Sequence, residues 1–233
     1  MSGAHDIGGI VFDKDGTLFD FHTAWSAWTA ALIARLAETH GVSRGTLARA
    51  VDFDLEAEAF RRDSPMIAAT NRDGAEALAA VMPGADVDAI EHEMMLSSAD
   101  IPLAPAVPLG PFLDGLRGRG LRLGVMTNDT EYGARAHLKS AGVLDRFDFI
   151  AGFDSGHGAK PDPGPLLAFA RAVDIAPARA AMVGDSTHDL LAGRRAGMHT
   201  VGVLTGMADE DDLAPHADVV LPDIGHIPGW LTG

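Results

Sequence analysis

Apolar residues in the first part of the chain change from a continuous run to a helical spacing. Gly9–Phe12 is a short apolar run, which is typical of a buried strand. From Trp25 to Leu36 the apolar residues fall at helical spacing, and Gly41 is well suited to end that helix. Further helical patterns cover Thr46–Arg62, Thr70–Met82 and Asp86–Ala99. We therefore predict one early strand, followed by a block of helices that contains no strand.

A different alternation begins after a cluster of prolines. Pro102, Pro105, Pro108 and Pro111 predict a loop or linker. Beyond them, strand patterns cover residues 121–126, 149–151, 180–183, 200–204 and 219–221, and helical patterns lie near 131–141, 164–173 and 189–196. This alternation predicts an α/β fold with a doubly wound, Rossmann-like parallel sheet and helices on both faces. The predicted core domain comprises residues 1–19 and 105–233, and residues 20–104 form an inserted, all-helical domain.

Composition limits the class of protein. Of the 233 residues, 47% are hydrophobic, which is enough for a globular core. No apolar run approaches the roughly 20 residues of a membrane-spanning helix, and the N-terminus lacks a signal-peptide pattern. The chain has no cysteine, so disulfides and thiolate metal sites are excluded. We expect a cytoplasmic protein, a monomer or homodimer, that does not bind membranes.

The charge of the chain bears on its partners. The formal net charge is −15, which opposes nonspecific binding to nucleic acid because such binding needs Lys and Arg to neutralise phosphates. A small anionic substrate is still compatible, since a local cationic pocket can outweigh a diffuse field. Lysine occurs only at Lys14, Lys139 and Lys160.

Polar clusters follow several of the predicted strands. They are Asp13–Thr17, Thr127–Asp129 and Gly184–Asp189, joined by Lys160 in a loop. In open parallel sheets, ligands bind beyond the carboxyl ends of the strands. We therefore expect these residues, which are distant in sequence, to meet at one edge of the sheet.

The pair Asp13 and Asp15 predicts a metal site. Two carboxylates this close raise each other's pKa unless a cation or hydrogen bonds intervene, and Mg²⁺ prefers oxygen ligands such as carboxylates, waters and a substrate phosphate. Asp13 and Asp185 end different strands and can share one ion. A Ca²⁺ loop of the EF-hand type would need Glu at its twelfth position, which is Ala24 here. A simple Asx turn is the other alternative.

The same pair of aspartates can catalyse phosphoryl transfer. Asp13 can attack a phosphoryl group and form an aspartyl-phosphate. Asp15 can protonate the leaving oxygen and then activate water for the second step. Gly16 allows a sharp turn beside the ligand, and Thr17 can hydrogen-bond to Asp15 and hold its orientation.

The later clusters supply cationic and polar groups. Thr127 and the Asn128 amide can hold phosphate oxygens, and Lys160 can neutralise charge that develops on the transferred group. Asp189 can orient waters or Lys160 around the metal ligand Asp185. Each feature has an ordinary alternative: a turn after the strand, a solvated loop lysine and a helix cap.

These motifs, in this order, resemble those of the haloacid dehalogenase-like (HAD) superfamily. The pattern of that family is DxDGT, a strand-end Ser or Thr, a Lys and GDxxxD, which correspond here to Asp13–Thr17, Thr127, Lys160 and Gly184–Asp189. The inserted helices resemble the family's C1 cap, as in phosphoglycolate phosphatase-like members. The resemblance implies that Mg²⁺ is held by Asp13, Asp185 and the backbone carbonyl of Asp15, and that the cap closes over the substrate.

Several branches of the family are distinguished by single residues. Asp15 disfavours the dehalogenases, which lack that aspartate, and the P-type pumps, which carry DKTGT and need membrane helices. Phosphonate-cleaving relatives use a cap lysine, but no lysine lies between Lys14 and Lys139. The β-phosphoglucomutase branch has a cap-hinge histidine where this chain has Trp25, and His22 is offset by three positions.

The resemblance and the residues together predict a Mg²⁺-dependent phosphomonoester phosphatase. Its substrate would be a small phosphorylated metabolite, phosphoglycolate or a sugar phosphate. A sugar phosphomutase and a non-catalytic phosphate-ester sensor are the alternatives. Within Arg61–Met66, Arg62 can meet a substrate carboxylate or second phosphate, with Asn71 and Arg72 as a second choice. The alternative is that these arginines pair with acids on the cap surface.

Overall fold

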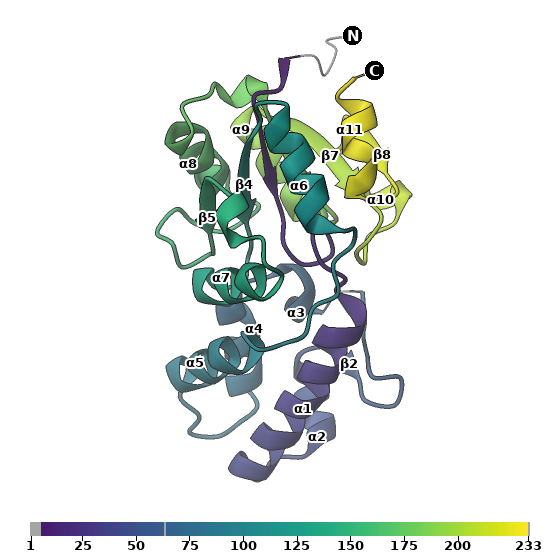
Figure 1. Cartoon of the computed structure of the whole chain (residues 1–233). Helices are drawn as coiled ribbons and strands as arrows, with labels where there is room; N and C mark the ends of the chain where they lie inside the picture. Colours follow the sequence, from purple (N-terminus) through teal and green to yellow (C-terminus); the bar gives the residue numbers. More distant parts are fainter. Residues whose placement is uncertain (1–5, 63, 233) are drawn as a thin grey trace. The chain divides into compact units, whose positions relative to one another are not determined.

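A parallel sheet of six strands forms the centre of the larger of two compact units, and Figure 1 shows how its strands are arranged. The computed structural model describes residues 6–62 and 64–232. One unit comprises the chain up to Phe21 and from Leu103 onward, and the other comprises His22–Pro102. The strands of the larger unit are β1 (Gly9–Phe12), β4 (Arg122–Met126), β5 (Phe149–Ala151), β6 (Ala180–Gly184), β7 (His199–Val203) and β8 (Val219–Leu221).

The order of the strands places β1 at the centre of the sheet. The order is β5-β4-β1-β6-β7-β8, and each neighbouring pair is parallel. The chain therefore continues from β1 to both sides, to β4 on one side and β6 on the other. In such sheets the point of reversal, beyond the carboxyl ends of the strands, is where ligands bind. The predicted doubly wound parallel sheet is confirmed.

Helices cover both faces of this sheet. Successive residues of a strand point to opposite sides, and in β1 both sets of side chains are apolar, so both faces are buried. Ile10 and Phe12 of β1 face a core cluster that includes Leu113, whereas Val11 faces a second cluster that includes Phe169. The helices of this unit are α6 (Leu109–Gly118), α7 (Glu131–Ser140), α8 (Gly164–Ala172), α9 (Thr187–Ala196), α10 (Glu210–Leu213) and α11 (Ile227–Trp230), with 3₁₀ turns η2 (Leu144–Arg146), η3 (Pro177–Arg179) and η4 (Ile224–His226).

The predicted loop across the prolines is wrong at its C-terminal end. Helix α6 begins at Leu109 and includes Pro111 in its first turn. Proline is tolerated there because the first N–H groups of a helix have no intrahelical partner. Leu109, Leu113 and Leu116 bury one face of α6 in the core cluster that includes the sheet residues Ile10 and Phe12. The helical spacing of these leucines therefore outweighs the local effect of proline.

The smaller unit is mainly helical, but the prediction that it is all-helical and contains no strand is wrong, because it also contains a small hairpin. Its helices are α1 (His22–His40), α2 (Arg44–Ala50), α3 (Pro65–Ala68), α4 (Asn71–Ala79) and α5 (Val87–Ser98). Two-residue strands β2 (Phe53–Asp54) and β3 (Ala59–Phe60) pair antiparallel after α2. The helix predicted over Thr46–Arg62 therefore ends at Ala50.

Backbone conformation ends this helix and turn chemistry forms the hairpin after it. Asp52, two residues beyond α2, has a φ of +48°, in the left-handed region that a right-handed helix cannot use. The Asp54 carboxylate accepts hydrogen bonds from the backbone amides of Glu56 and Ala57, at 3.0 and 3.1 Å. An aspartate that bonds its own backbone in this way forms an Asx turn, which competes with a helix. Phe53 and Phe60 then pack edge to face across the hairpin, with ring centroids 5.2 Å apart.

Helix α1 forms part of the core of the smaller unit. Trp25 and Trp28 are both buried and pack edge to face, with ring centroids 5.3 Å apart. The indole N–H of Trp28 donates to the Ser97 hydroxyl of α5 at 3.1 Å. Across the described parts of the chain, no helix is both long and apolar enough to cross a membrane.

Gly124 of β4 has no room for a side chain, which provides a test of the packing. A β-carbon there would lie 2.6 Å from the ring of Phe169, which is fully buried. We expect Gly124→Ala to lower the free energy of unfolding by about 1–3 kcal/mol, because overpacking forces the ring and the backbone to shift. Urea denaturation measures this change.

Gly115 of α6 is the matched control. A β-carbon there meets nothing within 4 Å, so Gly115→Ala should raise the free energy of unfolding by about 0.5–1 kcal/mol, because alanine is favoured over glycine inside a helix. A decrease in stability would argue against a helix at this place in the proline-containing segment.

Candidate active site

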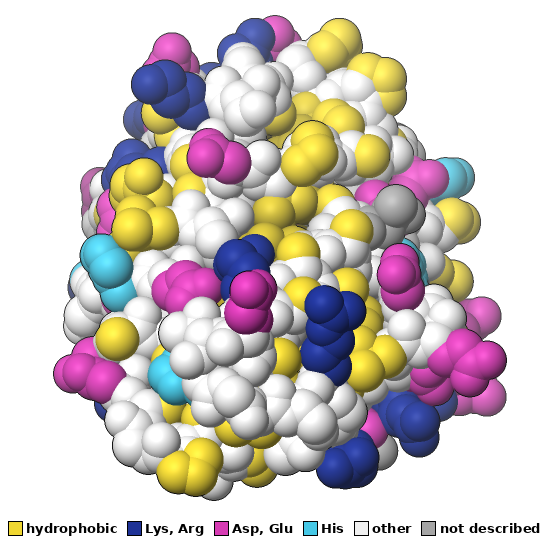
Figure 2. All heavy atoms as spheres, turned by 90° about the horizontal axis from the view of Figure 1, so that it is seen from below, with side chains coloured by type: hydrophobic (Ala, Val, Ile, Leu, Met, Phe, Trp, Pro, Cys, Tyr) yellow, Lys and Arg dark blue, Asp and Glu magenta, His cyan; other side chains and the backbone are white. Residues whose placement is uncertain are grey.

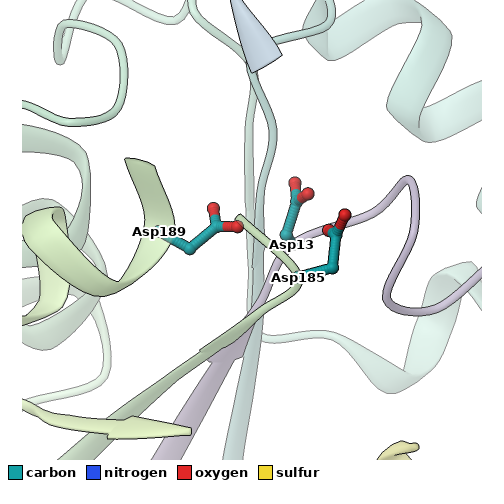
Figure 3. A group of neighbouring side chains, drawn as sticks. All are labelled: Asp13, Asp185 and Asp189. Carbon is teal, nitrogen blue, oxygen red and sulfur yellow. The ribbon is translucent and has the colours of Figure 1, made fainter. Parts of the chain in front are cut away.

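The carboxyl ends of β1 and β6 bring two aspartates together. Asp13 follows β1 and Asp185 follows β6, and these strands are neighbours in which Phe12 pairs with Val183. Asp189, in the first turn of α9, completes a buried cluster whose carboxylate oxygens lie within 4.8 Å of one another. Figure 3 shows the three side chains side by side at the strand ends and the start of the helix. Asp13, Asp185 and Asp189 therefore lie close together at one edge of the sheet, as predicted from the sequence.

Lys160 reaches this cluster from the loop between β5 and α8. Its ammonium lies 2.7 Å from Asp13 Oδ1 and 2.6 Å from Asp189 Oδ1, and the residue is 5% exposed. Burial alone would lower the pKa of Lys160, but the charges of Asp13 and Asp189 outweigh it and raise the pKa above its ordinary value. The lysine is therefore a fixed cation inside the site and not a solvated loop side chain.

Asn128 fixes the backbone that carries this lysine. Its side-chain NH₂ donates to the Lys160 carbonyl oxygen, and its side-chain oxygen accepts from the Lys160 N–H, both at 2.9 Å. Arg195 of α9 donates to the carbonyl oxygen of Pro161 at 2.8 Å. Because the Asn128 side chain is used in this way, its predicted contact with a phosphate would come from its backbone N–H.

Thr127 occupies the end of β4, beside the central strand. It is buried, and its hydroxyl accepts a hydrogen bond from the Asp129 N–H at 3.1 Å. The hydroxyl proton is not used in that bond and can be donated to a ligand oxygen. Thr127 therefore has the chemistry expected of a phosphate-binding residue, and that role remains a prediction.

The buried carboxylates have pKa values that reflect their surroundings. Burial raises the pKa of Asp13 to about 7, with Lys160 opposing the shift and Asp189 and Asp15 adding to it. Burial and the charges of Asp13 and Asp189 raise the pKa of Asp185 well above its ordinary value. Protein groups therefore do not fully compensate the charged forms of these two residues.

The donor set fits a divalent metal ion. It consists of carboxylate oxygens, the hard ligands that Mg²⁺ prefers, and a dication would compensate the negative charge that raises their pKa values. Asp189 is poorly suited to be a direct ligand, because Lys160 donates to its Oδ1 and Ser186 donates to its Oδ2. Asp13 and Asp185 are therefore the best candidates for side-chain ligands. The role of the Asp15 backbone carbonyl as a further metal ligand stays a prediction.

Asp189 combines two functions that the sequence presented as alternatives. Its Oδ2 accepts from the backbone N–H and the hydroxyl of Ser186, at 3.1 and 2.7 Å, and so completes the capping box of α9. Its Oδ1 accepts from Lys160 at 2.6 Å. The residue that caps the helix therefore also orients the lysine.

Thr17 contacts a different aspartate from the one expected. Its hydroxyl donates to Asp185 Oδ1 at 3.2 Å, whereas the sequence predicted a bond to Asp15. The expected sharp turn at Gly16 is present, with a φ of +76°, and places the backbone against Asp185: a β-carbon at position 16 would clash with the Asp185 carboxylate. This turn directs Thr17 to the carboxylate of the neighbouring strand.

Sequence reasoning missed the loop that encloses Asp185 from another direction. Gly206 follows β7, the neighbour of β6, and a β-carbon there would clash with the carboxylate of Asp185. Thr205 donates to the Gly16 carbonyl oxygen at 2.6 Å. A Thr-Gly pair after a strand is ordinary turn composition, so only the strand order identifies this loop as part of the site.

Asp15 is held by a lysine to which the sequence assigned no role. Lys14 Nζ lies 2.5 Å from Asp15 Oδ2, and Lys14 is fully buried. The same ammonium contacts Asp129 and His137. Burial alone would lower the pKa of Lys14, but the charges of Asp15 and Asp129 outweigh it and raise the pKa. The predicted proton-transfer residue is therefore next to a buried, charged lysine.

The predicted specificity residues belong to the other compact unit. Arg62 is exposed, and its neighbour Asp63 lies outside the described residues. The role of Arg62 in recognition stays a prediction. Arg72 pairs with acids of α4 and α5 at 2.5 to 3.0 Å, which supports the alternative of surface pairing for that arginine. Asn71 donates from its side chain to the Glu91 carbonyl oxygen at 3.3 Å.

A comparison with protein families agrees with the motifs that form this site. A family model described as haloacid dehalogenase-like hydrolase matches residues 7–197. Because the match covers most of the chain, this protein belongs to the haloacid dehalogenase-like hydrolase family. The family predicted from the motifs is thereby confirmed.

Individual relatives point the same way. A probable phosphatase, IndB of Dickeya dadantii, is 33% identical over 223 residues, which are 94% of this chain and 91% of that protein. A phosphoglycolate phosphatase of Rhodospirillum rubrum is 36% identical over 119 residues, 51% of this chain and 49% of that protein. The crystal structure of CbbY from Rhodobacter sphaeroides in complex with phosphate has a TM-score of 0.72, with 22% identity over 97% of this chain and 100% of that one, and so shares the fold. The predicted enzyme class, a hydrolase of the phosphatase type, is confirmed.

The raised carboxylate pKa values predict how stability depends on pH. In the metal-free protein, Asp13 has a pKa of about 7 in the folded state, against an ordinary value of 3.8 for an unperturbed aspartate. Between these values the folded state binds more protons than the unfolded state, so stability falls as pH rises from about 4 to about 7. Asp185 shifts in the same direction. Mg²⁺ needs the ionised carboxylates, so the increase in Tm that it causes should be larger at about pH 8 than at about pH 5.

Calorimetry in EDTA and in excess Mg²⁺ measures this dependence. Asp13→Asn should remove much of the pH dependence of the metal-free protein. Asp145→Asn, at an exposed position of the same unit, should leave it unchanged. A Mg²⁺ effect that is equal at both pH values would show that these carboxylates do not titrate with metal binding.

Proposed function

We propose that this protein is a Mg²⁺-dependent phosphomonoester phosphatase that acts through an aspartyl-phosphate on Asp13. The observation that carries the proposal is the contact of Asp13 with Lys160 beside Asp185, since a nucleophile, a fixed cation and a second carboxylate share one buried site. Family membership and the similar probable phosphatase of Dickeya dadantii support the hydrolysis of phosphate esters.

The groups of the site can bind and orient a phosphate. Mg²⁺, held by Asp13, Asp185 and the Asp15 carbonyl, would supply charge to neutralise phosphate oxygens. Lys160 adds a positive charge next to the transferring group, in a buried place where charge is poorly screened. The Thr127 hydroxyl is the side-chain donor to the phosphate oxygens.

The first step transfers the phosphoryl group to the protein. A carboxylate oxygen of Asp13 forms a bond to phosphorus while the bond between phosphorus and the ester oxygen breaks. Asp15 donates a proton to the departing oxygen, so that an alcohol leaves. The step ends with a phosphorylated Asp13 and an ionised Asp15.

The second step returns the enzyme to its starting state. Asp15 accepts a proton from a water molecule as the water oxygen bonds to phosphorus. The bond between phosphorus and the Asp13 oxygen breaks, and inorganic phosphate leaves. One aspartate therefore acts as acid in the first step and as base in the second.

We propose a small phosphorylated metabolite as the substrate, phosphoglycolate or a sugar phosphate. The similarity to the phosphoglycolate phosphatase of Rhodospirillum rubrum supports the first of these, over about half of each chain. A sugar phosphomutase is the alternative. Trp25, which occupies the place of the hinge histidine in that branch, packs on Trp28 as a buried core residue, so no observation favours the mutase. A non-catalytic sensor would not need both Asp13 and Asp15.

The location, partners and oligomeric state of the protein are also part of the proposal. The net charge of −15 supports the absence of a nucleic-acid partner. A cytoplasmic location, no association with membranes, and a monomeric or homodimeric state complete the proposal.

Loss of the nucleophile provides the direct test of this function. With p-nitrophenyl phosphate and Mg²⁺, we expect the wild-type protein to release phosphate and Asp13→Asn to lose activity by a factor on the order of 10³ or more, because it cannot form the covalent intermediate. Asp145→Asn, the exposed control, should keep full activity. Retained Mg²⁺-dependent turnover in Asp13→Asn would rule out the mechanism.

Recognition by Arg62 is tested with a panel of phosphate esters. We expect Arg62→Ala to lower kcat/KM about tenfold or more for esters that carry a second anionic group, since a hydrogen bond to a charged group contributes about 1.5–3 kcal/mol. Esters without that group should be affected less. Arg72→Ala serves as the control, because its guanidinium is already paired with acids. If Arg62→Ala leaves the ranking of the esters unchanged, Arg62 has no part in recognition.

A further inference from the structure

Lys14, to which the phosphoryl-transfer mechanism assigns no role, lies at the centre of a polar network that includes Asp15. Its Nζ is 2.5 Å from Asp15 Oδ2, 3.1 Å from His137 Nδ1 and 3.2 Å from Asp129 Oδ2. Lys14 is 0% exposed and His137 is 2% exposed. An ammonium has three N–H donors, and three acceptor atoms surround this one at hydrogen-bonding or ion-pair distance.

The chemistry of this network defines the state of His137. A lysine ammonium donates and cannot accept, so His137 Nδ1 must be the acceptor in their contact. The imidazole is therefore neutral, with its proton on Nε2. These contacts place one ammonium next to the acidic side chains of Asp15 and Asp129 and a neutral ring. Charge thus permits Lys14 to remain ionised in a buried position.

Backbone hydrogen bonds and helix α7 hold three members of the network, Lys14, Asp129 and His137. The Lys14 carbonyl oxygen accepts from the backbone amides of Leu18 and Phe19, at 3.0 and 3.1 Å. The Asp129 Oδ1 accepts from the N–H of Thr130, the N-cap of α7, at 2.7 Å. His137 lies in the same helix. Helix α7 therefore fixes two of the three groups that surround the ammonium.

We propose that Lys14 is a positioning residue for proton transfer: its ammonium, held by Asp129 and His137, fixes the Asp15 carboxyl in the orientation from which it protonates the leaving oxygen. The inference rests on the proposed function, because it assigns a role to a neighbour of the proton donor. Lys14 does not itself contact the reacting atoms in this account.

The contact also selects one oxygen of the carboxyl group. Oδ2 faces an ammonium donor and therefore acts as an acceptor, so Oδ1 is the oxygen that is open to a proton when Asp15 serves as the acid. Without the ammonium, the carboxyl could rotate and present either oxygen. Lys14 is thus expected to matter most when the leaving oxygen needs a proton.

Two esters with different leaving groups test this role. p-Nitrophenolate leaves without protonation, whereas the alkoxide of β-glycerol phosphate needs a proton in the same step. Rapid-quench kinetics should measure the rate at which each ester phosphorylates the protein. We expect Lys14→Met to slow phosphorylation by the alkyl ester at least about tenfold more than phosphorylation by the aryl ester, with KM for both within about twofold of wild type.

The control is the same substitution at an exposed lysine. Lys139→Met, also in α7, should change neither rate. An equal slowing of both esters by Lys14→Met would mean that Lys14 only supports the fold, and would overturn the proposal. If the wild-type protein forms no phosphorylated intermediate from either ester, the proposed function itself fails, and this outcome is distinct from an equal slowing.

A second variant keeps the test decisive if Lys14→Met does not fold. His137→Leu replaces the imidazole, one acceptor of the Lys14 ammonium, with an apolar side chain of similar size. It leaves the ion pair of Lys14 with Asp15 in place. It should shift the ratio of the two rates in the same direction by a smaller factor. An unchanged ratio in a folded His137→Leu protein would contradict the role of the network.

Discussion

The enclosure of several carboxylates around one ammonium is the constraint on which the site depends. Asp13, Asp185 and Asp189 lie within 4.8 Å of one another in a buried place, and Lys160 is the ammonium that contacts two of them. Like charges this close are unfavourable without compensation, as the raised pKa of Asp13 shows. The proposed Mg²⁺ accounts for an arrangement that would otherwise only reduce stability. The same charge balance would leave Asp13 ionised, as the proposed nucleophile must be.

The sheet creates this enclosure through its strand order. Because β1 is flanked by β4 and β6, three neighbouring strands end in Asp13, Thr127 and Asp185 at the point where the winding reverses. Hydrogen bonds then fix the groups that the loops contribute: Asn128 clamps the backbone of Lys160. The polar groups are therefore preorganised by the backbone of the core, which is the condition for strong electrostatic stabilisation in a buried site.

Sequence patterns predicted the strands of the core and the residues that meet at their ends, because both depend on short-range features: apolar runs and the polar residues that follow them. They failed where the outcome depends on tertiary contacts. The helix α6 forms despite Pro111 because its leucines pack on the core. Thr17 bonds Asp185, which belongs to a distant segment. The contacts of Lys14 with His137 and of Gly206 with Asp185 likewise join residues that only the fold brings together.

Isothermal titration of the metal-free protein with Mg²⁺ measures whether Asp13 and Asp185 hold one ion between them, as we propose. The account predicts one bound ion per chain near neutral pH, with release of protons, because the pKa of Asp13 is about 7 before the ion binds. It also predicts that Asp185→Asn loses this binding, whereas Asp189→Asn retains the stoichiometry. Binding by Asp185→Asn with the affinity and proton release of the wild-type protein would contradict the account.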